Sequence, residues 1–213
     1  MGIHGMNRTV DYYNQHSKEY FEATCSTDMS DLYDAFLPYL PAGGRILDVG
    51  CGSGRDLKYF KEHGYKAEGV DASEELCRLA SEYSGCKVTC CRIEDYVTAN
   101  KYDGIWCCAS LLHLDDEALR QFFCRCTDWL AENGILFLSV KTGITDGPDE
   151  NGRWFRDFNE GKLTKLLEKN SKLSLERVFF TEDKTGRQGW KWMNVVMQKR
   201  QQCRERENAA FKR

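Results

Sequence analysis

Residues 46–56 read ILDVGCGSGRD, a short apolar run that passes directly into a glycine-rich turn. An apolar run of this length that ends in glycine is typical of a buried strand in a parallel sheet covered by helices on both faces. Gly50, Gly52 and Gly54 permit backbone conformations that other residues avoid, so the chain can turn tightly and approach a ligand closely. The segment therefore predicts an α/β fold with a ligand site after its first strand.

Patterns of strand and helix alternate along the rest of the chain. Such alternation predicts a doubly wound, mostly parallel Rossmann-like sheet of about seven strands, and the final apolar runs suggest an antiparallel last strand. The expected strands are residues 45–49, 66–71, 87–90, 103–108, 134–140, 173–181 and 190–197. The expected helices between them are residues 55–63, 73–84, 115–130 and 159–168.

The 213 residues suit a single α/β domain, because one core of this size leaves little material for another. Helical spacing from residue 12 to 39, broken around 24–28, predicts two helices before the first strand. The expected parts of the domain are N-terminal lid helices at 1–44, a cofactor-binding core at 45–140, a substrate-side segment at 141–198 and a charged tail at 199–213.

Asp71 ends the second predicted strand, where an acidic residue can accept hydrogen bonds from the ribose hydroxyls of an adenosine cofactor. A dinucleotide would favour the spacing G-x-G-x-x-G and a helix start open to an anion. Here Arg55 stands in place of the glycine, and Asp56 would repel phosphate. The pattern favours a cofactor without phosphates, whose amino-acid and sulfonium end would benefit from Asp48 and Asp56.

With these residues the chain resembles the class I S-adenosylmethionine-dependent methyltransferases, and more loosely their small bacterial branch of tellurite-resistance type. ILDVGCGSGRD resembles their first motif and GVDAS at 69–73 the second, while YDGIWCCASLLHL and ENGILFLSVK resemble the fourth and fifth strands. The resemblance implies that S-adenosylmethionine is the cofactor and that the N-terminal helices form a lid. It also implies that Glu94 or Asp95 accepts from the adenine amine. The predicted cofactor-binding residues are Asp48, Gly50, Cys51, Gly52, Ser53, Asp71, Ala72, Ser73, Ile93, Glu94, Asp95, Cys108, Tyr12 and Tyr20.

Candidate residues for the acceptor side follow the fourth and fifth predicted strands and the loops above them. Methyl transfer from a sulfonium is an in-line displacement, so alignment and exclusion of water can suffice. His113 could act as a general base or serve only in capping and packing. Arg153, with Arg187, Trp190 and Trp192, could form an arginine and aromatic wall, although the two tryptophans could equally face the core. We take His113 and Arg153 as catalytic candidates.

The eleven cysteines of a chain without an export signal predict reduced thiols and a cytoplasmic location. They lack the paired C-x-x-C spacing of a structural zinc site, so we expect no metal. Cys51 and Cys108 could instead capture a thiophilic metalloid acceptor, or pack as small hydrophobic residues.

The net charge of −3 provides no general positive field for nucleic acid, and no apolar run is long enough to span a bilayer. We therefore expect a small-molecule methyl acceptor, no membrane partner, and a monomer or homodimer. Three alternatives stay open: methylation of tRNA or protein with help from the arginines after residue 199, a non-catalytic cofactor-binding module, and a dehydrogenase.

Overall fold

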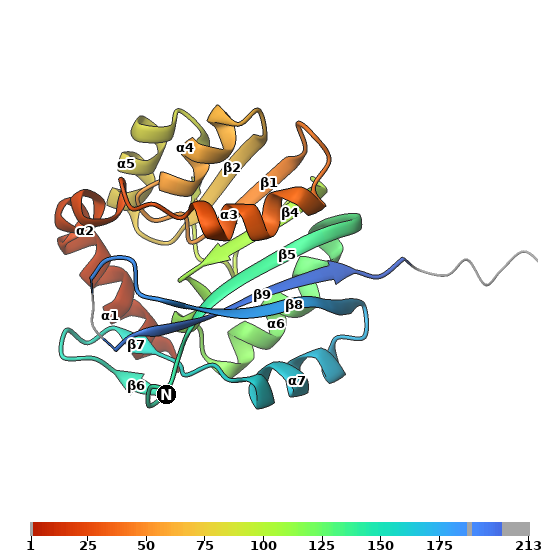
Figure 1. The fold of residues 1–213 in the computed structure, drawn as a ribbon. Helices are drawn as coiled ribbons and strands as arrows, with labels where there is room; N and C mark the ends of the chain where they lie inside the picture. The colour runs from red at the N-terminus through yellow and green to blue at the C-terminus, as the bar shows by residue number, and fades with distance from the viewer. Residues whose placement is uncertain (1, 187–188, 202–213) are drawn as a thin grey trace, which may run out of the picture.

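A seven-stranded sheet in the order β3-β2-β1-β4-β5-β9-β8 forms the centre of the molecule (Figure 1). The computed structural model describes residues 2–186 and 189–201. Neighbours from β3 to β5 are parallel, whereas β9 is antiparallel to both β5 and β8. The strands are β1 (Arg45–Val49), β2 (Lys66–Asp71), β3 (Lys87–Cys90), β4 (Tyr102–Cys108), β5 (Leu130–Thr142), β8 (Leu173–Glu182) and β9 (Lys191–Lys199). The predicted mostly parallel sheet with an antiparallel last strand is confirmed.

Helices cover both faces of this sheet (Figure 1). On one face, α3 and α4 pack against side chains such as Trp106 and Phe137, whose rings stack 4.0 Å apart. On the other face, α6 and α7 cover a larger apolar cluster that includes Leu136 and Met193. The helices are α3 (Ser30–Phe36), α4 (Arg55–Glu62), α5 (Glu74–Ser84), α6 (Asp116–Trp129) and α7 (Glu160–Lys169).

Two of the predicted helices begin with side-chain caps. The Ser73 hydroxyl accepts from the Leu76 N–H at 3.2 Å, and the Asp115 carboxylate accepts from the Ala118 N–H at 2.9 Å. Each cap satisfies one backbone donor that the first helical turn leaves without a partner. These caps fix where α5 and α6 leave the carboxyl end of the sheet.

The N-terminal region contains more breaks than the sequence predicts. Helix α1 (Gly2–Gln15) is followed by α2 (Ser17–Thr24), α3 and a short 3-10 turn η1 (Leu37–Tyr39). The predicted break around 24–28 is present between α2 and α3, but the prediction of only two helices is wrong, because a further break at His16 separates α1 from α2. Apolar spacing continues across His16, so periodicity gave no sign of this break.

A small hairpin and a short turn complete the structure. Strands β6 (Gly147–Pro148) and β7 (Trp154–Phe155) pair with each other, and η2 (Leu111–His113) follows β4. Arg187 and most of the predicted charged tail, residues 202–213, lie outside the described residues. No helix within the described ranges is long and apolar enough to cross a membrane.

Candidate functional site

Two neighbouring cavities open at the carboxyl ends of β1 and β4, where the strand order reverses direction. Ligands of doubly wound folds bind at this kind of switch point. The first cavity measures about 830 Å³ and the second about 800 Å³, each counted out to its open mouth. Four residues line both cavities: Tyr13, Tyr20, Ala109 and His113. A ligand in either cavity therefore lies against the same wall as a ligand in the other.

The glycine turn after β1 lies against the first cavity and leaves no room for side chains. Gly50, Gly52 and Gly54 all have positive φ, at 70°, 52° and 76°. A Cβ atom on Gly50 would lie 2.4 Å from Cβ of Ser110, and one on Gly52 would lie 3.2 Å from the ring of Tyr20. The turn thus brings bare backbone up to the cavity, as the sequence predicts.

Asp71 lies in the first cavity at the end of β2, beside the glycine turn. Its Oδ2 accepts from the Gly52 N–H and its Oδ1 from the Ser73 N–H, both at 2.9 Å. Burial raises the pKa of this carboxyl, and the backbone donors oppose that rise. Each oxygen keeps a second lone pair, so the carboxylate can still accept from a pair of ribose hydroxyls.

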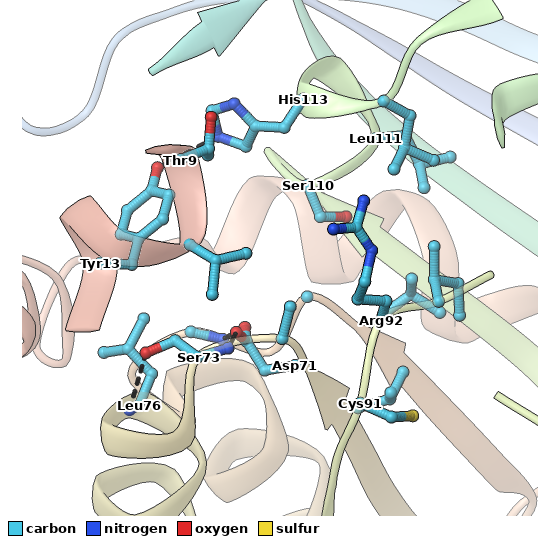
Figure 2. A pocket seen from close by; sticks show the side chains of 18 of the residues that line it. Thr9, Tyr13, Asp71, Ser73, Leu76, Cys91, Arg92, Ser110, Leu111 and His113 are labelled. Carbon is cyan, nitrogen blue, oxygen red and sulfur yellow. Dashed lines mark hydrogen bonds between the residues drawn. The ribbon is translucent and has the colours of Figure 1, made fainter. Parts of the chain in front are cut away.

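Ser110 follows β4 and faces the same cavity (Figure 2). Its hydroxyl is buried and has no hydrogen-bond partner among the described residues. The preceding Ala109 adopts a left-handed conformation, with φ of 57°, and its N–H donates to the Ser139 carbonyl. A strained residue next to an unsatisfied buried hydroxyl is a combination found at ligand sites.

The side of the first cavity predicted to hold adenine is formed mainly by the segment after β3. Ile93 and Glu94 line it together with Ala72 and Ser73, as predicted. Arg92 also lines it, and its guanidinium pairs with the Glu94 carboxylate at 3.2 Å. Of the two predicted acceptors for the adenine amine, Glu94 therefore lies in the cavity.

Helix α1 closes the first cavity from the opposite side (Figure 2). Thr9 and Tyr13 are four residues apart, so both face the cavity from the same side of the helix. Asn14 fixes the helix to the start of α5, because its Oδ1 accepts from the Ser73 hydroxyl at 2.7 Å. Thr9 fixes it to β7, where its hydroxyl accepts from the Trp154 N–H at 3.0 Å. The helix thus bridges the start of α5 and the β6–β7 hairpin.

His113 stands between the two cavities in a defined tautomer. Its Nδ1 lies 2.6 Å from the Trp154 carbonyl oxygen, which can only accept, so Nδ1 carries the proton. Nε2 therefore accepts from the Tyr13 hydroxyl at 3.1 Å. Burial lowers the pKa of the imidazole to about 4, and Arg153 acts in the same direction. His113 is neutral at physiological pH.

Arg153 lines the second cavity from the β6–β7 hairpin. Its Nε and Nη2 donate to Oδ2 of Asp149 at 2.9 and 2.7 Å. Its guanidinium also lies over aromatic rings, 4.6 Å from the centroid of Tyr12 and 5.1 Å from that of Phe155. The arginine is therefore held in one orientation by both an ion pair and ring faces.

Arg55 lines the second cavity and is oriented by Asp56 behind it. The Asp56 carboxylate accepts two hydrogen bonds from Arg55, one from Tyr33 at 2.6 Å and one from Trp106 at 2.8 Å. Burial alone would raise the pKa of Asp56, but Arg55 and these donors hold it below its usual value. Asp56 thus makes its hydrogen bonds within the protein and does not line the first cavity. This differs from the prediction that Asp56 would lie near the charged end of the cofactor.

Several predicted cofactor residues do not line the first cavity. Tyr12 lies about 100° around α1 from Tyr13, so it packs against His16 and Arg153 instead. Cys108 lines the second cavity, because adjacent strand residues alternate between faces. The remaining predicted residues outside the first cavity's lining are Asp48, which is buried in β1, Cys51 and Ser53, which are buried in the turn, and Asp95, which is exposed.

Other lining residues were missed by sequence reasoning. Arg92 reaches the cavity because it follows β3, which lies beside β2, and Ser110 reaches it because it follows β4, which lies beside β1. The spacing of residues 9 and 13 on one helix was a usable signal. The residues that line the first cavity outside the predicted cofactor set are Thr9, Val10, Tyr13, Val49, Val70, Leu76, Cys91, Arg92, Ala109, Ser110, Leu111, His113 and Leu114.

The described cysteines are free thiols, and the one that lines the second cavity is poorly suited to bind a metalloid. Ten cysteines occur as free thiols in the described part of the chain, and burial raises the pKa of Cys108 to about 12. Within residues 2–186 and 189–201, no group of three or more His, Cys, Asp or Glu side chains is arranged to hold a metal ion. The high pKa of Cys108 disfavours its thiolate, the form that binds metalloids most strongly.

Comparison with known proteins identifies relatives of this chain. A family model described as a methyltransferase domain matches residues 20–181. N-terminal Xaa-Pro-Lys N-methyltransferase 1 of Xenopus tropicalis is 32% identical over 143 residues, which is 61% of each protein. The ubiquinone biosynthesis O-methyltransferase of Xanthomonas axonopodis pv. citri is 34% identical over 107 residues, 47% of this chain and 44% of that enzyme. The chain thus matches about half of the length of these curated relatives.

Solved structures share the fold at low sequence identity. A 1,6-didemethyltoxoflavin-N1-methyltransferase from Burkholderia thailandensis, solved with 1,6-didemethyltoxoflavin and S-adenosylhomocysteine, has a TM-score of 0.73 at 20% identity. The similarity covers 92% of this chain and 88% of that one. A TehB-like S-adenosylmethionine-dependent methyltransferase from Corynebacterium glutamicum has a TM-score of 0.67 at 22% identity, covering 87% and 99% of the two chains.

Proposed function

This chain belongs to the methyltransferase-domain family, and from that premise we propose that it transfers the methyl group of S-adenosylmethionine to a small molecule held in the second cavity. The membership makes the chain an S-adenosylmethionine-dependent methyltransferase. This choice of acceptor is supported mainly by one observation, the wall that two cavities of similar volume share. A concave site lined by aromatic side chains and a few polar groups is typical of small-molecule sites.

The residues of the first cavity suit S-adenosylmethionine. The turn at Gly50 and Gly52 offers backbone to the methionine portion, and Asp71 retains lone pairs for the ribose hydroxyls. Glu94 is positioned to accept from the adenine amine, and the Ser110 hydroxyl lacks a partner that the ligand would supply. When bound, the cofactor supplies an electrophilic methyl group on a positively charged sulfur.

His113 and Tyr13 are the proposed route for the acceptor's proton. They line both cavities, and Nε2 of the neutral His113 already accepts from the Tyr13 hydroxyl. An acceptor O–H or N–H next to Tyr13 would pass its proton to the Tyr13 oxygen, while the hydroxyl proton of Tyr13 moves to Nε2. The low pKa of His113 limits it to transient protonation, so the proton must leave again to water.

Arg153 is proposed to orient the acceptor rather than to exchange a proton. Its guanidinium is fixed by Asp149 and by the ring of Phe155, and its pKa is raised. A permanent positive charge in the second cavity would attract an acceptor with a partial or full negative charge. Alignment of this kind can supply much of the rate of an in-line displacement.

Methylation of a protein is the second candidate, because one relative is an N-terminal Xaa-Pro-Lys N-methyltransferase. Other relatives are named for small molecules, including a phosphoethanolamine N-methyltransferase of Plasmodium falciparum that is 28% identical over 127 residues, 57% of this chain and 46% of that enzyme. The name of a relative does not decide the acceptor, since one fold serves many substrates.

Release of S-adenosylhomocysteine measures the proposed function directly. The purified full chain is incubated with S-adenosylmethionine and either a metabolite extract filtered to remove macromolecules or a peptide that begins Ala-Pro-Lys. We expect product with the extract and none with the peptide, and Asp71→Asn should need about 10- to 100-fold more S-adenosylmethionine for the same rate. Turnover of the peptide alone would favour the protein methyltransferase, and no turnover with tight cofactor binding would favour a non-catalytic module.

A further inference from the structure

We propose that the methyl acceptor is a planar aromatic compound with an acidic O–H or N–H group, held between aromatic side chains of the second cavity. The inference rests on the proposed small-molecule function and narrows its substrate class. It depends on three features of the second cavity: its ring-lined walls, the way these rings are held, and the cations already placed among them.

Aromatic rings form much of the wall of the second cavity. They come from separate parts of the chain: α1, α2, β7 and the beginning of β9. Tyr13 and Tyr20 pack edge to face with centroids 5.1 Å apart, and Phe155 and Trp190 do so at 6.3 Å. The rings that line this cavity are Tyr13, Tyr20, Phe155, Trp190 and Trp192. Rings around a cavity offer a flat guest both stacking and edge contacts.

Polar anchors hold these rings in place before any acceptor binds. The Trp192 Nε1 donates to Oδ2 of Asp183 at 3.1 Å, and the Tyr13 hydroxyl donates to His113. Asp183 is itself fixed, since its Oδ1 accepts from the N–H and the hydroxyl of Thr185. Walls that are already ordered lose little side-chain entropy on binding, which favours a rigid, flat ligand over a flexible one.

Cations of the protein already lie against the aromatic faces, which argues against an amine acceptor. The Lys141 Nζ lies 2.8 Å from the ring centroid of Trp190 and 5.2 Å from that of Phe155. The Arg153 guanidinium lies 5.1 Å from the centroid of Phe155. A cationic acceptor would have to compete with these charges for the rings and would also be repelled by them.

The two arginines that line the cavity favour an acceptor that can lose a proton. Arg55 and Arg153 both line the cavity, each fixed by its own aspartate. Although the acidic Glu182 and Asp183 line it as well, Asp183 is engaged by Trp192 and Thr185. Aromatic hydroxyls and ring N–H groups lose a proton more readily when positive charge stabilises their anion. The anion is a stronger nucleophile toward the methyl group than the neutral group is.

Calorimetry on the full chain saturated with S-adenosylhomocysteine tests the substrate class without requiring turnover. Each aromatic probe is paired with its saturated counterpart: catechol with cis-1,2-cyclohexanediol, and 2-naphthol with decahydro-2-naphthol. Phosphoethanolamine serves as the amine probe. We expect at least one aromatic probe to bind about tenfold more tightly than its counterpart, as one or two ring contacts would give, and no binding of phosphoethanolamine.

Variants of one hairpin assign this preference to the cavity. Trp192→Leu should remove the preference for the aromatic probe, Trp192→Phe should keep it within about threefold, and all variants should bind S-adenosylhomocysteine normally. Phe180→Leu is the matched control, because Phe180 lies on the neighbouring strand β8 and is 52% exposed. A preference that survives Trp192→Leu, or that Phe180→Leu also removes, would overturn the assignment.

The outcomes separate this inference from the function on which it rests. Equal affinity for aromatic and saturated probes, or methylation of phosphoethanolamine, would overturn the aromatic class and leave small-molecule methyl transfer standing. Selective binding of an aromatic probe without methyl transfer to any small molecule would support the class of ligand and count against the proposed function.

Discussion

Gly50 is the residue with the least tolerance for change in the first cavity. A Cβ atom there would meet Cβ of Ser110 at 2.4 Å, in addition to the cost of its φ of 70°. We expect Gly50→Ala to weaken binding of S-adenosylhomocysteine about 10- to 100-fold in calorimetry, because the turn must shift to relieve the overlap.

Gly64→Ala separates backbone strain from this steric overlap. Gly64 also has positive φ, at 84°, but a Cβ atom added there would have no neighbour within 4 Å. This variant should lose about 1 kcal/mol of stability and bind S-adenosylhomocysteine normally. Normal binding by Gly50→Ala would show that the turn does not approach the cofactor.

Asp71 has a double role that an amide cannot reproduce. Its two oxygens accept from the Gly52 and Ser73 N–H groups, and in the proposed function both also accept from the ribose hydroxyls. Asp71→Asn keeps the size but provides one acceptor oxygen, so the dissociation constant for S-adenosylhomocysteine should rise about 10- to 100-fold. Asp103→Asn, at the start of β4 near Arg45, is the control and should bind normally.

His113 should make the stability of the protein depend on pH. Its pKa is about 4 in the folded state against 6.5 in the unfolded chain, so the unfolded state binds more protons between these values. The contribution is therefore present above pH 6.5 and is lost as the pH falls through 4. Because the side chain is partly exposed, we expect a loss of roughly 2 kcal/mol.

Chemical denaturation at a series of pH values measures this contribution. The difference in unfolding free energy between the wild type and His113→Gln should change by roughly 2 kcal/mol from pH 7 to pH 4, in favour of the variant. His16→Gln is the control, since His16 is exposed. Parallel pH profiles for wild type and His113→Gln would contradict the burial of a neutral imidazole.

At the level of elements, we propose that helix α1 acts as a latch on the first cavity. Asn14 joins it to the start of α5 and Thr9 joins it to β7. Asn14→Ala should increase the dissociation rate of S-adenosylhomocysteine about two- to tenfold, the effect of one hydrogen bond, in stopped-flow fluorescence. Asp11→Ala, an exposed change on the same helix, should leave the rate unchanged, and an equal rate for both variants would exclude the latch.

The elements differ in how far the sequence determined them. The predicted bounds of β1, β2 and β3 match the structure to the residue. Strand β1 ends before Gly50 and β2 ends at Asp71, and each of these residues interrupts an apolar run. The two-residue strands β6 and β7 could not be predicted, since no periodic pattern fits in two residues. Asp71 and the glycine turn could be found from spacing alone, whereas Arg92 and Ser110 depend on which strand ends become neighbours.

At the level of the whole molecule, cofactor binding should stabilise the fold. A ligand at a hundred times its dissociation constant adds about 2.7 kcal/mol, which corresponds to a rise of about 5–10 °C in melting temperature for a chain of this length. Differential scanning fluorimetry should show this rise with S-adenosylhomocysteine and none with NAD. A rise with NAD alone would restore the dehydrogenase alternative.

Tyr13 and His113 belong to the walls of both cavities, and this has a thermodynamic consequence. If the occupant of one cavity moves the Tyr13–His113 pair, it changes the affinity of the other occupant, and linkage requires the same factor in both directions. A single coupling free energy therefore describes two measurements: how S-adenosylhomocysteine changes the affinity for the acceptor, and how the acceptor changes the affinity for S-adenosylhomocysteine. Product inhibition and acceptor selectivity would then both depend on this one pair of side chains.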